Sequence, residues 1–126
     1  MLKPSEIELR IIRDMLAEEY GPTSALLDQV RRLRFDKRHL TGTGFYVHFP
    51  STDRSTPANC PDNEITKFAQ TRLPSPQNSV GFTVFIRNGR LSSFEGYTFG
   101  DVHWPAEPME NWLVLKETAA TRHEAK

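Results

Sequence analysis

Apolar residues recur at helical spacing near the start of the chain, at Leu9, Ile12, Leu16 and Tyr20. Side chains three or four positions apart share one face of an α-helix. Ser5 and Glu8 have the spacing of a capping box, in which each side chain binds the other residue's backbone amide. Gly21 and Pro22 end the pattern because proline cannot continue a helix. The sequence therefore predicts an amphipathic helix over residues 5–20.

A second helical pattern starts at Thr23 or Ser24 and presents Leu26, Leu27, Val30 and Leu33 on one side. The Gly-Pro break between the two patterns predicts either a helical hairpin or two helices that cross one face of a sheet. After Arg34 the period changes from helical to extended. The polar residues 35–40 predict a solvated or edge strand.

Residues 45–49 form a candidate strand, with Phe45, Val47 and Phe49 on one face and Tyr46 and His48 on the other. Residues 51–63 consist mainly of turn formers and prolines, which predict a mobile loop. Residues 64–70 are a further candidate strand. Ile65 and Phe68 do not share a two-residue period, so this segment either contains a bulge or is not a strand.

Three assignments complete the chain. Residues 73–79 are rich in proline and polar residues and predict a second loop. The apolar run 112–115 predicts a closing strand. From Glu117 onward no apolar face is present, so residues 117–126 predict a flexible C-terminal tail.

The clearest local signal is Asn88-Gly89, a two-residue turn between apolar runs that predicts a β-hairpin. A simple register places Arg87 opposite Arg90 and then pairs Ile86 with Leu91, Val84 with Ser93 and Phe82 with Glu95. The predicted core face carries Phe82, Val84, Ile86 and Leu91. The second face carries Phe85 and Phe94.

Glu95 would then lie on the apolar face, where an unpaired carboxylate costs several kcal/mol. Two interpretations follow. Glu95 pairs at the rim of the sheet with a helix arginine, Arg10 or Arg13, or it stands in a cleft where burial adjusts its pKa.

These elements predict one α+β domain over residues 1–116, with two N-terminal helices packed on a mostly antiparallel meander sheet. The hairpin at Asn88-Gly89 would lie at its centre.

The 126 residues include 16 basic and 16 acidic residues, and this balance argues against a dedicated nucleic-acid binder. Cys60 is the single cysteine, so no disulfide within the chain is possible. The sequence shows no signal peptide and no apolar run of membrane-spanning length. We expect a cytoplasmic protein without a membrane segment.

Candidate chemistry is sparse. Asp101 and His103, joined by Glu95 or His48, are the best candidate metal ligands, but no closely spaced ligand motif is present and no metal is expected. Cys60 has no neighbouring base that would activate a thiol. No phosphate-binding loop is expected either, and hence no cofactor.

Charge is distributed unevenly along the chain. Basic residues cluster at 31–38, and this cluster has a weak likeness to a nucleic-acid groove that is better explained as a solvated surface. Between Leu91 and Leu115 there is no Lys or Arg, although four acidic residues fall there. Such polarity suits a protein partner or self-association. Trp104 would either anchor an interface or plug the open end of the sheet.

Two segments, GTGFYVHF and GFTVFIRNGRLSSFEGYTFGDVHWP, resemble a group of small bacterial proteins of uncharacterised function. Those proteins have an N-terminal helix, a GxGF strand and a C-terminal GFxLFxxxGxLxxLEGYTYxxxWP motif. The matching residues are Gly42, Gly44, Phe45, Phe49, Gly81, Phe82, Phe85, Ile86, Gly89, Leu91, Glu95, Gly96, Tyr97, Trp104 and Pro105. Phe94, where the motif has Leu, and the longer loop at 51–63 depart from it. The resemblance covers about half of the chain and implies a small cytoplasmic α+β protein, with no activity to carry over.

Two functional hypotheses remain. The first is a non-enzymatic protein-interaction module or homo-oligomer; one form of such a module binds and neutralises a partner, as small immunity proteins do. The alternative is a small ligand-binding or enzymatic domain with a cleft around Glu95, Tyr97 and His103. The candidate binding residues are Glu95, Tyr97, His103, Trp104 and His48.

Overall fold

The computed structural model describes residues 1–72 and 79–114. Two α-helices come first, α1 (Glu6–Tyr20) and α2 (Ala25–Val30). The strands are β1 (His39–Leu40), β2 (Gly44–His48), β3 (Asn63–Thr71), β4 (Ser79–Arg87), β5 (Arg90–Thr98) and β6 (Leu113–Val114). Two short 3₁₀ helices, η1 (Pro50–Arg54) and η2 (Met109–Asn111), lie in connections. The predicted α+β fold with N-terminal helices is confirmed.

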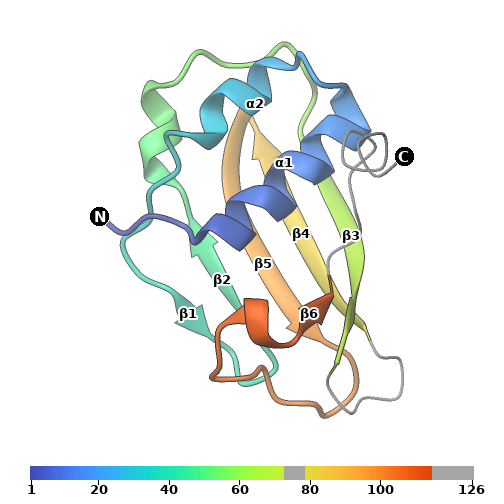
Figure 1. Ribbon diagram of the computed structural model, residues 1–126. Coiled ribbons are helices and arrows are strands. Elements are labelled where there is room, and N and C mark those ends of the chain that lie inside the picture. Colours follow the sequence, from blue (N-terminus) through green and yellow to red (C-terminus); the bar gives the residue numbers. More distant parts are fainter. Residues whose placement is uncertain (73–78, 115–126) are drawn as a thin grey trace.

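The strands form one sheet of order β1-β2-β5-β4-β3-β6, and every pairing is antiparallel. The predicted meander comprises β3, β4 and β5, whereas β2 lies beside β5, far from it in sequence. Both α-helices lie on one side of the sheet, with α1 crossing the strands (Figure 1). Neither helix within the described residues has the length and apolar content needed to cross a membrane.

The helices begin where the sequence predicts. Glu8 N donates to Ser5 Oγ at 3.3 Å and Ser5 N donates to Glu8 Oε1 at 3.0 Å, which is the predicted capping box. Ser24 caps α2, because its hydroxyl accepts from Leu26 N at 3.1 Å. Gly21, at φ 88°, ends α1.

The core lies between α1, α2 and one face of the sheet. Its largest fully buried side chains include Phe82 and Phe94, whose rings stack with centroids 5.7 Å apart. The helices contribute Ile12, Leu16, Leu26 and Val30, all at most 1% exposed. Burial of each such side chain contributes about 1.5–3 kcal/mol. The packing of the helices on the sheet is therefore the main source of stability.

The hairpin turn is as predicted, with positive φ at Asn88 and Gly89 and with Arg87 opposite Arg90. The register beyond the turn was predicted wrongly. A β-bulge follows the Ile86–Leu91 pair, so Phe85 pairs with Ser93 and Val84 pairs with Phe94. One extra residue in β5 sends every later side chain to the opposite face.

The bulge exchanges the predicted positions of an aromatic ring and a charge. Phe94 enters the core at 1% exposure instead of lying on the second face. Glu95 pairs with Thr83 on the face away from the helices, so it does not lie beside Phe82 on the apolar face. This register is favoured because it buries a ring and leaves a carboxylate accessible to water.

Segments between the helices and the central strands also differ from the prediction. The expected edge strand at 35–40 is reduced to β1, and Phe35 is buried and bridges to Leu2 through backbone bonds of 2.7 and 2.9 Å. The segment 51–63 contains η1, where the buried Thr52 hydroxyl contacts Leu91 O at 2.7 Å.

The third strand needs no bulge. Its pairing with β4 is continuous from Asn63 to Gln70. Ile65 points into the core and Phe68 lies on the other face, which explains why they do not share a two-residue period. The predicted loop at 73–79, except Ser79, and the predicted tail at 117–126 lie outside the described residues.

Candidate functional site

Neither α-helix lies against the second face of the sheet, which we call the open face (Figure 1). Alternation along the strands places there the side chains of His39, Tyr46, His48, Glu64, Thr66, Phe68, Thr83, Phe85, Arg87, Ser93, Glu95 and Tyr97. Cross-strand neighbours on one face of an antiparallel sheet are close enough for their side chains to interact. The open face therefore brings together residues that are far apart in sequence.

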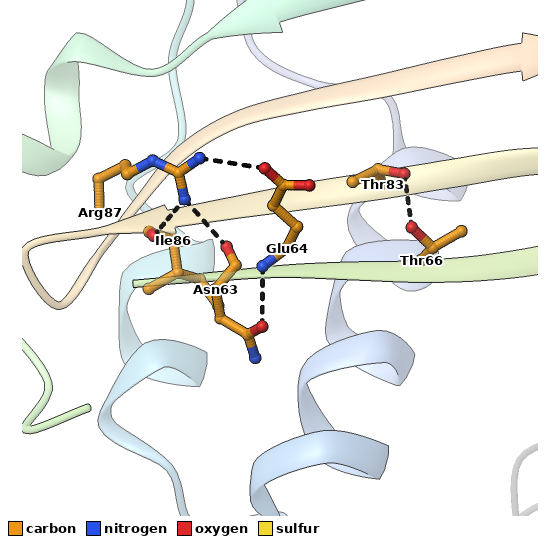
Figure 2. Close-up of polar contacts among 6 residues, drawn as sticks. All are labelled: Asn63, Glu64, Thr66, Thr83, Ile86 and Arg87. Carbon is orange, nitrogen blue, oxygen red and sulfur yellow. Dashed lines mark hydrogen bonds and ion pairs between the residues drawn. The ribbon is translucent and has the colours of Figure 1, made fainter. Parts of the chain in front are cut away.

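Glu95 lies near the middle of the open face, with Tyr46 beside it on β2 and Thr83 beside it on β4. Figure 2 shows the neighbouring part of this face, where Thr66 and Thr83 share a hydrogen bond of 2.9 Å and Glu64 meets Arg87 at 3.3 Å. The predicted pairing of Glu95 with a helix arginine is wrong, since the bulge turns Glu95 away from α1.

Burial raises the pKa of Glu95 above its ordinary value of 4.5, and the charge of Glu64 adds to the shift. A raised pKa means that the folded chain holds this proton more tightly than the unfolded chain does. The ionised carboxylate therefore lowers stability at neutral pH, and this penalty disappears as the pH falls through the raised pKa.

Glu95→Gln is accordingly expected to unfold at a higher denaturant concentration than the wild type at neutral pH. The difference should shrink as the pH falls toward the ordinary carboxyl pKa, because the wild-type side chain then becomes neutral as well. Denaturation of both proteins at several pH values measures this difference. Burial also raises the pKa of Asp14, but both proteins contain Asp14, so its contribution to the pH dependence cancels in the comparison. A variant less stable than the wild type at neutral pH would contradict the prediction.

Tyr97 lies near the C-terminal end of β5, and its ring covers Gly81 on the neighbouring strand β4. A Cβ atom at position 81 would collide with the Tyr97 ring, so glycine at this position lets the ring lie flat against β4. Tyr97 meets Phe99 edge-on at 5.8 Å, and Phe99 lies 5.6 Å from Phe68. Phe68 remains 60% exposed. These rings form an aromatic group that is accessible to a partner.

His48 belongs to a second aromatic group at the β1–β2 edge. The His39 and Tyr46 rings stack at 4.5 Å and 6°, and His48 approaches Tyr46 edge-on at 5.5 Å. His48 itself is exposed. The open face thus carries rings toward both edges of the sheet with Glu95 between them.

His103 and Trp104 lie apart from these groups. His103 is exposed in the connection after β5. Trp104 lies on the helix side, where its ring is 5.2 Å from Phe45 and 5.1 Å from Trp112. Trp104 therefore closes the end of the sheet, as one of the two predictions for it stated. The predicted binding residues form no single site, because only Glu95, Tyr97 and His48 share the open face.

Trp104 joins the two glycine- and aromatic-rich segments of the sequence, GTGFYVHF and the segment that ends in HWP. Its backbone amide donates to Gly42 O at 2.9 Å, and its ring packs over Gly96. A Cβ atom at position 96 would lie 3.0 Å from the Trp104 ring and closer still to Phe45. The segments at 42–45 and 96–105 are thus one packing unit of the fold.

None of five hollows found among the described residues is lined by Glu95, Tyr97 or His103. The largest, of 540 Å³, lies between the start of α1, the β1–β2 turn and residues 104–110. An ion pair borders it, in which both amino groups of the half-buried Arg38 donate to the buried Glu8 carboxylate at 2.8 and 2.9 Å. Trp104 and Leu40 also line this hollow.

Metal and thiol chemistry find little support in the described part of the chain. No three His, Cys, Asp or Glu residues within it come close enough to hold a metal ion. The candidate ligands Asp101, His103, Glu95 and His48 are therefore not assembled into a site. Cys60 is half-buried beside the core in the connection that follows η1.

Sequence reasoning missed three residues of the open face, His39, Phe68 and Phe99. A signal existed for Phe68, since its position out of period with Ile65 marks the face opposite the core. His39 and Phe99 join the face only through the pairing of β1 and the path of the chain after β5. Local patterns do not carry that information.

No family model, no curated protein and no solved structure matches this chain. Conclusions about function therefore depend on the described surface itself. The open face is its most distinctive part, because aromatic, histidine and carboxylate side chains meet there on a rigid scaffold.

Proposed function

We propose that this chain is a non-enzymatic protein-interaction module that binds its partner through the open face. The observation that supports it most directly is the pair of aromatic groups, which lie on a sheet face that neither α-helix covers. Aromatic side chains are enriched at the energetically important positions of protein interfaces.

The scaffold behind this face favours recognition. Except for His39 on β1 and Phe99 after β5, the open-face side chains stand on the three longest strands and on β2, whose other face packs on the core, so the backbone holds them in place before a partner arrives. Pre-organised side chains lose little conformational entropy on binding. Glu95 at the centre offers one carboxylate that a partner's donor could satisfy.

The cleft hypothesis gains less support. A catalytic or small-ligand site needs a concave surface around its polar groups. Glu95 and Tyr97 stand on a sheet face and line none of the five hollows described above. The cross-strand neighbours of Glu95 are Tyr46 and Thr83. A surface for a macromolecule fits this geometry better.

Phe68→Ser and Tyr97→Ser are each expected to weaken partner binding by about tenfold or more, because each removes an exposed or half-exposed ring from the aromatic group. Leu40→Ser is the matched control, since Leu40 is 74% exposed but points away from the open face. Affinity capture from the source cells identifies the partner, and calorimetry with the purified pair measures the loss. Sedimentation of the chain alone tests whether the partner is a second copy.

The proposal fails if the chain neither captures a partner in near-stoichiometric amount nor self-associates. It fails equally if a partner is found whose affinity falls with Leu40→Ser and not with Phe68→Ser or Tyr97→Ser. Folding of each variant is verified by its amide spectrum, so that loss of structure is not mistaken for loss of contact.

A further inference from the structure

Two arginines flank the tight turn of the central hairpin. Arg87 and Arg90 are directly opposite each other in the register of β4 and β5. Like charges at opposite positions of an antiparallel pair lower stability. A local conflict of this kind in an otherwise consistent hairpin is expected where a side chain serves a function.

The structure holds both guanidinium groups in place. Arg87 Nη1 donates to Ile86 O at 2.9 Å and to Asn63 O at 3.2 Å, as Figure 2 shows, and its guanidinium lies 5.6 Å from the centre of the Phe85 ring. Arg90 Nε donates to Ser55 O at 3.2 Å. These bonds to carbonyl groups fix the position of each cation without neutralising its charge.

Of the two arginines, Arg87 forms an ion pair and Arg90 forms none with the described residues, although Asp62 accepts a hydrogen bond from the Asn88 amide at the same turn. Arg87 has one acidic partner, Glu64, and that contact is solvent-exposed, with the Glu64 side chain at 60% exposure. Within the described residues no carboxylate comes within ion-pair distance of Arg90. Asp53 lines the same hollow but does not form an ion pair with either arginine.

The two arginines line a hollow of 310 Å³ between the hairpin turn and η1. His48 contributes an imidazole from β2, and Ser92 contributes a hydroxyl. Ser92 stands in the bulge region of β5, and bulges commonly redirect a side chain toward a functional position. The hollow therefore combines two fixed cations with two further hydrogen-bonding side chains from separate strands.

We infer that this hollow binds a phosphate dianion, either free inorganic phosphate or a phosphomonoester carried by another molecule. Guanidinium groups match the oxygen spacing of phosphate and donate paired, charge-assisted hydrogen bonds. A phosphate dianion is attracted more strongly by guanidinium groups than a carboxylate or a phosphodiester, each of which carries a single charge. His48 and Arg87 belong to both the hollow and the open face, but the inference is tested separately because Phe68 and Tyr97, the residues that test the open-face interaction, lie toward the far end of the strands.

Titration of the ¹⁵N-labelled full chain with inorganic phosphate at constant ionic strength tests the inference, at about pH 7.5 where the dianion predominates. Saturable shifts of the amides from Asn88 to Ser92 are expected. Arg90→Gln should weaken phosphate binding by about tenfold or more. Arg90→Lys should retain only part of the wild-type affinity, since Lys keeps the charge but lacks the paired N–H donors of a guanidinium group. Arg72→Gln, an exposed arginine beyond the other end of β3, should bind as the wild type does.

Parallel titrations separate the sources of phosphate. Tighter binding of O-phosphoserine than of phosphate would support a phosphomonoester on a partner, and binding of phosphate alone would support the free ion. Equal shifts with acetate, tighter binding of a short oligothymidine, or an unchanged affinity in a folded Arg90→Gln variant would each overturn the inference. The amide spectrum of each variant shows whether it is folded.

Discussion

Gln29→Leu is expected to lower the free energy of unfolding by about 2 kcal/mol. Gln29 is 2% exposed, and its side-chain amide donates to Gly89 O at 3.0 Å and to Thr56 O at 3.1 Å. Its oxygen accepts from Leu91 N at 2.9 Å. Leucine fills the space but leaves the buried Leu91 amide without this partner, at a cost of about 1–3 kcal/mol, whereas Gly89 O keeps its bond from Ala58 N at 2.8 Å.

Chemical denaturation of the two proteins measures this loss, and Gln70→Leu on the exposed side of β3 is the matched control. The control is expected to change stability by less than about 0.5 kcal/mol, as most surface substitutions do. Amide exchange adds a local measurement, because the Leu91 amide should exchange faster in Gln29→Leu. A loss below about 1 kcal/mol would show that water replaces the missing bonds.

Arg38→Ala is the second change for which a large effect is expected, about 3–5 kcal/mol of destabilisation. The Glu8 side chain is 3% exposed, and Arg38 provides both of its charged hydrogen bonds. The same guanidinium lies 4.6 Å from the centre of the Phe45 ring. Without Arg38 a carboxylate remains buried and unpaired, which is much more costly than losing a surface contact.

Two further variants test that explanation. Arg38→Met combined with Glu8→Gln should recover much of the loss, because Met fills the space and Gln still accepts from the Ser5 amide. Lys67→Ala removes the ion pair with Glu18, whose side chain is 68% exposed, and should cost less than about 1 kcal/mol. If Arg38→Ala costs no more than Lys67→Ala, the buried pair contributes less than its geometry indicates.

Local patterns predicted the elements of this fold well. The capping box at Ser5 and Glu8, the Ser24 cap and the Asn88-Gly89 turn each depend on residues close in sequence, so their physics is visible in the chain itself. The apolar period of the first helix was equally informative, because its buried positions follow it closely.

The arrangement of the open face was beyond such patterns. The position of β2 beside β5, which brings Tyr46 next to Glu95, depends on the whole sheet. The contacts of Gln29 with the hairpin, 60 and 62 positions away, are equally remote. A local sign of the bulge was present, since Leu91 and Phe94 can share the core face only if one residue between them is extra.

The bulge also bears on how this protein can evolve. Substitutions at Ser92 or Ser93 keep the length of β5 and therefore keep Phe94 inside and Glu95 outside. Deletion of the Ser92 codon would remove only the extra residue, so Ile86–Leu91, Phe85–Ser93 and Val84–Phe94 could pair as a regular ladder with Phe94 still inside. Lineages of this fold should consequently tolerate at this bulge both changes of residue type and the loss of one residue, without an exchange of the two faces of β5.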